Sequence, residues 1–247
     1  MMNVLFIGNA IIDVISHLDE IDQVDPNFIG KMQIVSQKEI NDKIKVLSNK
    51  KIIPGGSANN SACGLAMLEE EVCFIGKIGN DHYGKVYLDQ NKEHNVETGL
   101  MVVDNKSTTG LSLVYVTPGG ERTMNTFPGA SAELDASDIP KATFGGISGI
   151  FIEGYILYSP HGLELISKSI SNVITNKGFT AISLSDVDCV DRYRVHFLNL
   201  IKSNEINLIF GNKMEMMSLL EVKTEMDLIK SMKELSGVCR KINHDIG

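Results

Sequence analysis

Two adjacent glycines followed by amide side chains form the segment of this sequence best suited to hold a small polar ligand. Residues 54–60 read Pro-Gly-Gly-Ser-Ala-Asn-Asn. Gly55 and Gly56 lack a Cβ, so their backbone can adopt a positive φ and can approach a bound molecule closely. Asn60 lies one helical turn beyond Gly56, and its amide offers both donors and an acceptor to a sugar hydroxyl. The segment therefore predicts a binding site for a polyol.

The carboxylate of Asp13 is a second candidate for ligand binding. It follows Gly8-Asn9 and is expected at the carboxyl end of the first strand, where open parallel sheets bind their ligands. A carboxylate in that position can accept two hydrogen bonds from a diol. The alternative is that Asp13 only caps a turn, and a glycine pair can also be an ordinary turn. Taken singly, these residues leave both interpretations open.

A loop punctuated by three glycines, residues 76–84, directly follows a predicted strand and reads Gly-Lys-Ile-Gly-Asn-Asp-His-Tyr-Gly. Asp81 in this loop is expected to cap the next helix rather than to bind a ligand. The loop as a whole is a tight connection from a strand to a helix.

Short apolar runs predict the strands that must position these residues. Each run is followed by a polar turn and then by a helical pattern, which is typical of a parallel sheet in an α/β protein. The predicted strands are residues 4–7, 72–75, 149–152, 181–184 and 207–210. The predicted helices are residues 37–47, 58–68, 83–91, 163–174, 214–220 and 226–235.

An antiparallel hairpin is predicted inside this α/β pattern. Residues 111–117 alternate between apolar and polar side chains, residues 118–120 form a Pro-Gly-Gly turn, and residues 122–127 return. A hairpin in such a chain suggests a separate flap. The charged and weakly periodic residues 14–52 fit the same flap.

Composition limits the classes of partner. The 247 residues contain 23 Lys plus Arg and 31 Asp plus Glu, a net charge of −8 that argues against a nucleic-acid surface. The apolar start lacks a basic region, and no apolar run approaches the length of a membrane span. We therefore expect a cytoplasmic protein that binds small molecules, with no nucleic acid and no membrane as partner.

Cysteine spacing and glycine patterns exclude further classes. The four cysteines form no C-x-x-C pair and are expected to be reduced, structural thiols rather than a zinc site; they are Cys63, Cys73, Cys189 and Cys239. The sequence has no Gly-x-Gly-x-x-Gly after the first strand and no Gly-Lys-Ser or Gly-Lys-Thr, so neither a dinucleotide fold nor a P-loop is expected.

The glycine pair, Asn60 and the Gly-x-x-Gly-x-Asp-x-x-Gly loop together make a long pattern that resembles the ribokinase-like (PfkB) family of sugar and nucleoside kinases. The resemblance implies a three-layer α/β/α Rossmann-like ribokinase fold with a small β-rich lid and a missing C-terminal part. It assigns residues 1–13, 53–95 and 128–247 to an incomplete kinase core. It assigns residues 14–52 and 96–127 to the lid.

Residues 117–126 look like the flap hairpin of an adenosine-kinase-like bacterial subgroup. In that subgroup the next residues, Gly129 and Ala130, would line the substrate pocket. Residues 151–155 and 184–186 look like two further strand ends of the subgroup, and the first of these adds Glu153 to the substrate-binding residues.

The resemblance also implies roles for the residues singled out above. Asp13, Gly55, Gly56 and Asn60 would hold the sugar, and the flap would exclude water. Ile11 or Ile12, with Phe127, would sandwich a nucleobase, although such side chains are more often core. Arg122 is the cation expected nearest the pocket, with a solvated charge as the alternative.

The expected cofactors are ATP and Mg²⁺. Residues 212–215, Asn-Lys-Met-Glu, match an Asn-x-x-Glu element of the family. By resemblance, Asn212 and Glu215 would organise the nucleotide phosphates and Mg²⁺, with Glu215 acting on the metal through water. Lys213 departs from the acidic residue common at that position.

No Gly-x-Gly-Asp occurs in these 247 residues. In the family, a Gly-Ala-Gly-Asp turn forms the anion hole and supplies the catalytic Asp. We therefore expect an incomplete, adenosine-kinase-like enzyme that converts adenosine to AMP in its full form and is inactive without that turn. The alternative is a non-catalytic sugar- or nucleoside-binding protein of the same fold. The resemblance also suggests a homodimer formed through the lid.

Overall fold

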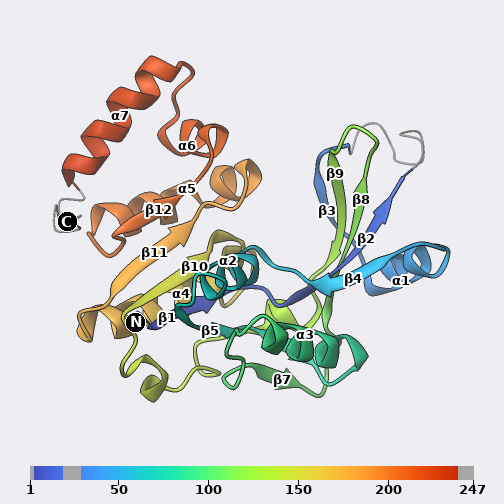
Figure 1. The fold of residues 1–247 in the computed structure, drawn as a ribbon. Helices are drawn as coiled ribbons and strands as arrows, with labels where there is room; N and C mark the ends of the chain where they lie inside the picture. Colours follow the sequence, from blue (N-terminus) through green and yellow to red (C-terminus); the bar gives the residue numbers. More distant parts are fainter. Residues whose placement is uncertain (1–2, 19–28, 239–247) are drawn as a thin grey trace. The chain divides into compact units, whose positions relative to one another are not determined.

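The computed structural model describes residues 3–18 and 29–238 (Figure 1). The chain divides into two compact units. Unit 1 comprises residues 1–7 and 135–247, and unit 2 comprises residues 8–134. Cys239 lies outside the described residues.

Parallel strands form the centre of unit 1, in the order β12-β11-β10-β1. Their bounds are β1 (Asn3–Ile7), β10 (Gly149–Glu153), β11 (Phe179–Ser183) and β12 (Leu208–Phe210). Leu5 pairs with Ile150, and both side chains are fully buried. Strands β1 and β10 are nearly continuous apolar runs because both of their faces are covered, whereas the edge strand β12 leaves Leu208 and Phe210 exposed.

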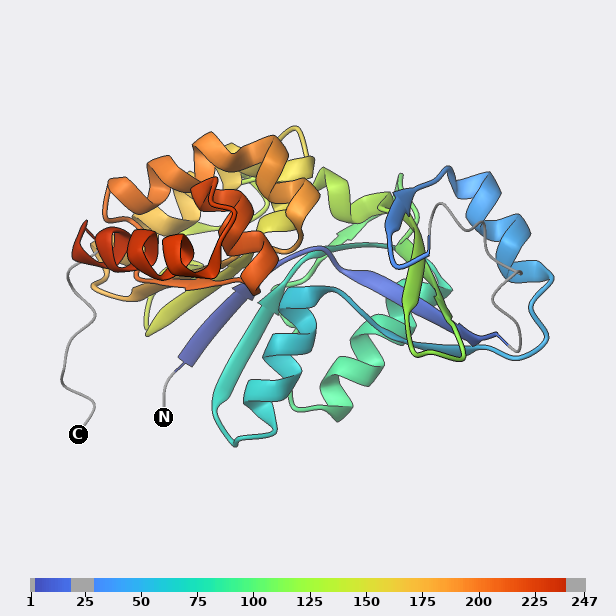
Figure 2. The same cartoon turned by 90° about the horizontal axis from the view of Figure 1, so that it is seen from above.

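Helices flank the strands of unit 1 (Figure 2). Their bounds are α4 (Gly162–Thr175), α5 (Val187–Lys202), α6 (Lys213–Leu220) and α7 (Glu225–Val238), with short 3₁₀ turns η4 (Lys141–Phe144) and η5 (Gly154–Tyr158). The first of these helices packs against β10 and β11, and α5 packs against α6. Leu165 and Ile166 are buried on the inner face of α4, as the helical spacing of its apolar residues predicts.

A five-stranded mixed sheet, in the order β3-β9-β8-β2-β4, dominates unit 2. Its strands are β2 (Ile11–His17), β3 (Met32–Ile34), β4 (Lys51–Pro54), β8 (Gly110–Val116) and β9 (Arg122–Phe127). Strands β8 and β9 are antiparallel, which confirms the predicted hairpin. Strand β2 runs parallel to β8 and antiparallel to β4.

The remaining elements of unit 2 are helices and short strands. They are α1 (Gln37–Lys45), α2 (Ser57–Ala66), α3 (His82–Glu93), η3 (Gly129–Glu133), β5 (Glu71–Ile75), β6 (Lys77–Gly79) and β7 (Val102–Asp104). Helix α1 contacts β8 and β9, α2 packs on β5, and α3 contacts β4, β2 and β6.

The structure confirms an α/β fold and the predicted elements, and it adds elements that were not predicted. Among them are the strands β2, β3, β4, β6 and β7. Residues 187–202 form a helix that the apolar spacing did not predict, because charged residues separate its buried ends and Tyr193 has non-helical dihedrals. Asp13 was expected at the end of the first strand, but that strand ends at Ile7 and Asp13 lies inside β2. The division into a core and a lid by residue number stays a prediction.

Asp81 caps α3, as predicted. Its carboxylate accepts hydrogen bonds from the backbone N of Gly84 at 2.8 Å, from the backbone N of Thr109 at 2.8 Å and from Thr109 Oγ1 at 2.7 Å. Burial on its own would raise the pKa of Asp81, but the hydrogen bonds from Thr109 and Gly84 outweigh it and hold this pKa below its ordinary value. One side chain therefore fixes the start of α3 and the start of the β8 segment together.

Replacing this cap should destabilise the protein. We expect Asp81→Ala to lower the free energy of unfolding by about 2 kcal/mol, because a helix cap is lost and the Thr109 groups lose their acceptor. Urea unfolding followed by circular dichroism measures the loss. Asp89→Ala, at an exposed position on the same helix, is the matched control and should change stability by less than about 0.5 kcal/mol. Equal stability of Asp81→Ala and the control would contradict the assignment.

Candidate functional site

The Asp13 carboxylate belongs to a row of polar side chains that crosses the sheet of unit 2. Asp13 pairs in register with Ser112 on β8, and Ser112 pairs with Thr126 on β9. Partners in register share one face of a sheet, so the three side chains point to the same side. Ser112 Oγ and Thr126 Oγ1 are 3.0 Å apart and hydrogen-bonded. We call these three residues the polar row.

Apolar side chains flank the polar row on the same face. Ile11 and Ile15 precede and follow Asp13 by two residues, and Ile53 on β4 pairs with it directly. All three are only half-buried. The opposite face of β2 carries Ile12 and Val14, which are fully buried. One face of the sheet is therefore core. The other face is partly open at Asp13 and its flanking isoleucines but buried at Ser112 and Thr126, which are each 5% exposed.

The glycine turn lies against Asp13. A Cβ at Gly55 would overlap the Asp13 carboxyl group, and a Cβ at Gly56, where φ is +92°, would overlap the carbonyl oxygen of Asn9. Gly55 N donates to Ile11 O at 2.7 Å, and Tyr87 Oη donates to Gly55 O at 3.4 Å. The turn therefore requires both glycines, as their conformational freedom suggested.

The two asparagines after this turn differ in environment. Asn60 is exposed on α2, and its backbone N bonds to Gly56 O at 2.9 Å. Asn59 is only 1% exposed, and neither its Oδ1 nor its Nδ2 has a hydrogen-bond partner among the described residues. Burying an amide without hydrogen bonds costs free energy. The Asn59 side chain therefore has an unused donor and acceptor at this position.

The other predicted substrate residues of unit 2 fall in different places. Ile11 lies on the face of the polar row, whereas Ile12 and Phe127 share the opposite face, so Ile12 rather than Ile11 is on the same face as Phe127. A role of these residues toward a nucleobase stays a prediction. Arg122 is exposed at the start of β9, on the face of the polar row. Gly129 and Ala130 begin η3.

The η3 start serves the structure through its backbone. Gly129 has a φ of +55°, and a Cβ there would overlap the carbonyl oxygen of Thr108. Ala130 is fully buried, and its backbone N donates to Thr108 O at 2.8 Å. The role of Gly129 and Ala130 in a substrate pocket stays a prediction.

The apolar surroundings change the acidity of Asp13. Burial raises the pKa of Asp13 from the ordinary value of 3.8 to about 6, although Arg122 acts in the opposite direction. The carboxylate is therefore still ionised at neutral pH, but at a cost in stability. Groups with shifted pKa values of this kind concentrate at functional sites.

The carboxyl ends of the unit 1 strands carry the remaining predicted residues. Glu153 ends β10 and is 1% exposed. Just beyond β11, Asp186 caps α5 by accepting from Cys189 N at 2.7 Å. Its other oxygen accepts from Tyr155 Oη at 2.9 Å. The pKa of the Cys189 thiol is raised, mainly because the thiol is buried and also because the carboxylates of Asp186 and Asp188 lie nearby.

Asn212 and Glu215 form a reciprocal capping box at the start of α6. Glu215 N donates to Asn212 Oδ1 at 2.9 Å, and Asn212 N donates to Glu215 Oε2 at 3.0 Å. Asn212 Nδ2 donates to Glu215 Oε1 at 2.5 Å. The described part of the chain contains no cluster of three or more side chains able to hold a metal ion directly. A role of Glu215 toward Mg²⁺ through water stays a prediction.

Three cysteines lie among the described residues, and all are free thiols. Burial raises the pKa of Cys73 to about 11, which makes its thiolate scarce. In the described ranges, no helix is both long enough and apolar enough to span a membrane.

Sequence reasoning missed several residues of the site. Ser112 and Thr126 could not be recognised as site residues, because they occupy ordinary polar positions of an alternating hairpin. Strand registers that align them with Asp13 would have revealed them. Tyr87 was missed because it lies on a helix and meets the glycine turn only through tertiary packing.

Asp13→Asn should stabilise the protein in a pH-dependent manner. Because the pKa of Asp13 is raised in the folded state, the stability it contributes is full below pH 3.8 and is lost as the pH rises through about 6. Asparagine resembles the protonated acid, so at pH 8 the variant should be more stable by about 2 kcal/mol after allowance for solvent screening. Urea unfolding at pH 4 and pH 8 measures the difference.

The gain should vanish at pH 4. Asp89→Asn, at an exposed carboxylate, provides the control and should behave as the wild-type protein at both pH values. A loss of stability in Asp13→Asn at pH 8 would show that the carboxylate is stabilising, contrary to this expectation.

The chain is similar to known sugar kinases. Residues 2–242 match the model of the pfkB family carbohydrate kinases. A 5-dehydro-2-deoxygluconokinase from Clostridium botulinum is 26% identical over 226 residues, covering 87% of this chain and 66% of the relative. A probable fructokinase-7 from Arabidopsis thaliana is 35% identical over 105 residues, covering 38% of this chain and 31% of the relative.

Two solved structures are similar over nearly the whole chain. The adenosine kinase from Sinorhizobium meliloti has a TM-score of 0.86 and 28% identity, covering 94% of this chain and 72% of that one. A probable sugar kinase from Rhizobium etli has a TM-score of 0.88 and 26% identity, covering 97% of this chain and 72% of that one. The chain spans less than two thirds of the length of the two curated relatives, the gluconokinase and the fructokinase. With the family model matching almost every residue, the chain belongs to the pfkB family of carbohydrate kinases.

Proposed function

We propose that this chain provides the acceptor-binding part of an ATP-dependent phosphotransferase that acts on the primary hydroxyl of a sugar or nucleoside. The observation that carries the proposal is the polar row of Asp13, Ser112 and Thr126 on a partly open sheet face, with the Gly55 backbone against the carboxylate. Family membership and the kinases among its relatives support it.

Adenosine, converted to AMP, is the acceptor we propose, which would place the enzyme in purine salvage. An ionised Asp13 accepts hydrogen bonds from two hydroxyls of a ribose. Ile11, Ile15 and Ile53 offer apolar surface beside it for a flat, weakly polar base. A fructose-like acceptor would use the carboxylate but leave that apolar surface uncovered. The similarity to an adenosine kinase supports the same choice.

In unit 1, Asn212 and Glu215 are the residues we propose for the nucleotide side. Bound ATP would supply the phosphoryl group, and Mg²⁺ would neutralise charge on its phosphates. The capping box at α6 places an amide and a buried carboxylate at a helix start, where backbone N–H groups favour anions. Glu215 would orient water on the metal rather than bind it directly, because both its oxygens already accept hydrogen bonds from Asn212.

Free thiols and the edge strands of the unit 2 sheet bear on location and assembly. Three free thiols in the described ranges support a reducing compartment, and we propose the cytoplasm. Small molecules remain the proposed partners, with no nucleic acid and no membrane. Strands β3 and β4 are the outer strands of the unit 2 sheet, and Ile34 on β3 is 58% exposed, which supports a homodimer through this region.

A second candidate function is binding without catalysis. The observation that favours it is that Asp13, Ser112, Thr126 and the Gly55 backbone lie together within unit 2 and can hold a polyol without any other part of the chain. Reading the gene beyond the codon for Gly247 distinguishes the two: a Gly-Ala-Gly-Asp segment supports the kinase, and a stop codon with retained ligand affinity supports the binding protein.

Ligand affinity should depend on the ionisation of Asp13. With a pKa of about 6, about a tenth of Asp13 is ionised at pH 5, so adenosine should bind about tenfold more weakly there than at pH 8. Isothermal titration of adenosine, ribose, fructose and inosine at both pH values measures this. Asp13→Asn should bind weakly with no pH dependence, and Asp89→Asn should match the wild-type protein. An unchanged dissociation constant in Asp13→Asn would refute the role of the carboxylate.

A polypeptide with this 247-residue sequence should not turn over. Loss of a general base removes about 10² to 10⁴ in rate, and loss of an anion-hole donor removes about 10² to 10³. A coupled assay for ADP, with adenosine or ribose as acceptor, should therefore stay at background while a complete adenosine kinase in parallel is active. Robust turnover by the purified protein would mean that other residues of this chain supply both functions.

A further inference from the structure

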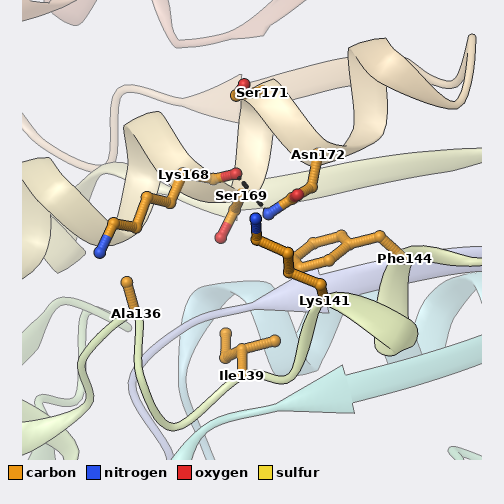
Figure 3. A pocket seen from close by; sticks show the side chains of 8 residues that line it. All are labelled: Ala136, Ile139, Lys141, Phe144, Lys168, Ser169, Ser171 and Asn172. Atoms are coloured by element: carbon orange, nitrogen blue, oxygen red, sulfur yellow. Dashed lines mark hydrogen bonds between the residues drawn. The ribbon is translucent and has the colours of Figure 1, made fainter.

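Side chains of η4, its preceding loop and α4 surround a cavity of about 280 Å³ within unit 1 (Figure 3). Ile139, Phe144 and Ser169 form its buried floor. Lys141, Lys168 and Asn172 stand around it. None of these residues belongs to the acceptor or nucleotide residues proposed above, so the cavity has no assigned role.

The hydroxyl of Ser169 is the most unusual feature of this cavity. Ser169 is 1% exposed, and its Oγ makes no hydrogen bond with any residue in the described ranges. Hydroxyls inside helices commonly bond to the carbonyl one turn earlier, as Thr175 Oγ1 does to Ser171 O at 2.8 Å in the same helix. Figure 3 shows the Ser169 oxygen on the cavity side of α4. The Ser169 hydroxyl therefore faces the cavity without a partner in the described chain and is available to a ligand as donor or acceptor.

The charged groups around the cavity favour an anion. Lys141 forms no ion pair with a described residue, and in Figure 3 its side chain extends toward the face of α4 that carries Ser169 and Asn172. Lys168 pairs with the exposed Glu164, 2.5 Å away. Asn172 Nδ2 donates one hydrogen bond to Lys168 O at 2.9 Å and has a second N–H to offer.

The acidic residues of the preceding loop are engaged within that loop. Asp135 Oδ1 accepts from Ser137 N and Ser137 Oγ, each at 2.6 Å. Asp138 Oδ2 accepts from Asp135 N at 3.1 Å. Lys168 on α4 is balanced by Glu164, so the ammonium of Lys141 on η4 is the cation at the cavity that has no ion pair among the described residues.

We propose that this cavity binds a small phosphomonoester through its phosphate group. The ammonium groups of Lys141 and Lys168, the Ser169 hydroxyl and the free N–H of Asn172 supply donors from several directions, which suits a tetrahedral oxyanion with several acceptor oxygens. The apolar floor of Ile139 and Phe144 accommodates the organic part. The site lies wholly within unit 1 and does not depend on the proposed kinase function.

Isothermal titration at constant ionic strength tests this site with two phosphate probes, inorganic phosphate and phenyl phosphate. Acetate and benzoate serve as control anions, because a planar carboxylate lacks the tetrahedral arrangement of oxygens. We expect Ser169→Ala and Lys141→Gln each to weaken phenyl phosphate binding by about tenfold, since each removes a hydrogen bond to a charged group. Lys202→Gln, at an exposed position on α5, is the matched control and should bind as the wild-type protein.

Thermal unfolding separates a binding role of Ser169 from a structural one. Its hydroxyl makes no bond within the described chain, so Ser169→Ala should keep the wild-type melting temperature without ligand and lose only the shift produced by phenyl phosphate. Tighter binding of phenyl phosphate than of phosphate confirms a phosphomonoester site, and equal binding of the two overturns the proposed role of the apolar floor. Absence of binding, equal affinity of the carboxylates, or full affinity in both variants overturns the proposal.

Discussion

The backbone of Gly55 lies directly against the carboxyl group of Asp13, and the rest of the unit 2 site is arranged around this contact. No side chain fits between them, since a Cβ at Gly55 would occupy the position of the carboxyl atoms. The bond from Gly55 N to Ile11 O fixes the turn to β2, and Tyr87 reaches it from α3. Because α2 begins at Ser57, two residues later, the same contact determines where its first amides lie.

This arrangement places a carboxylate where the surrounding side chains do not stabilise it. The neighbours of Asp13 on its face are mainly isoleucines. The hydroxyls of Ser112 and Thr126 form a hydrogen bond with each other. Folding alone would be better served by an apolar residue or a neutral amide. A residue that opposes stability and lies on a partly open face is more readily explained by ligand binding than by packing. Asn59, a buried amide without described partners, fits the same pattern near the same turn.

Continuous burial made the strands of unit 1 predictable. Strands β1 and β10 are short, buried apolar runs whose type and place follow from the sequence. Strand β12 was also predicted from its apolar run, although it lies at the edge of the sheet and is largely exposed. Strand β2 was not predicted, since a sheet with one open face tolerates Asp13 in mid-strand, and the sequence alone makes a carboxylate look like a strand end. Helix α5 was not predicted, because residues 191–194 interrupt its apolar spacing at the point where Tyr193 has non-helical dihedral angles.

The glycines and Asp13 could be identified from sequence because local chemistry requires them. Ser112 and Thr126 could not, because their importance comes only from the register of β8 against β2 and β9. Register depends on tertiary packing of the whole sheet rather than on any local pattern. A site residue at a polar position of an alternating polar–apolar strand therefore cannot be identified until the strand pairing is known.

The Asn-x-x-Glu element shows how one spacing can serve two purposes. A capping box requires the same separation of three residues, and Asn212 and Glu215 form one here. The cap restrains a buried carboxylate at the start of a helix, so little side-chain freedom remains to be lost if that carboxylate later orients hydrated Mg²⁺. Lys213, where the family commonly has an acid, places its ammonium 2.6 Å from Glu225 on α7. Its charge is thus directed toward a partner on another helix, and the departure from the family pattern leaves the capping pair intact.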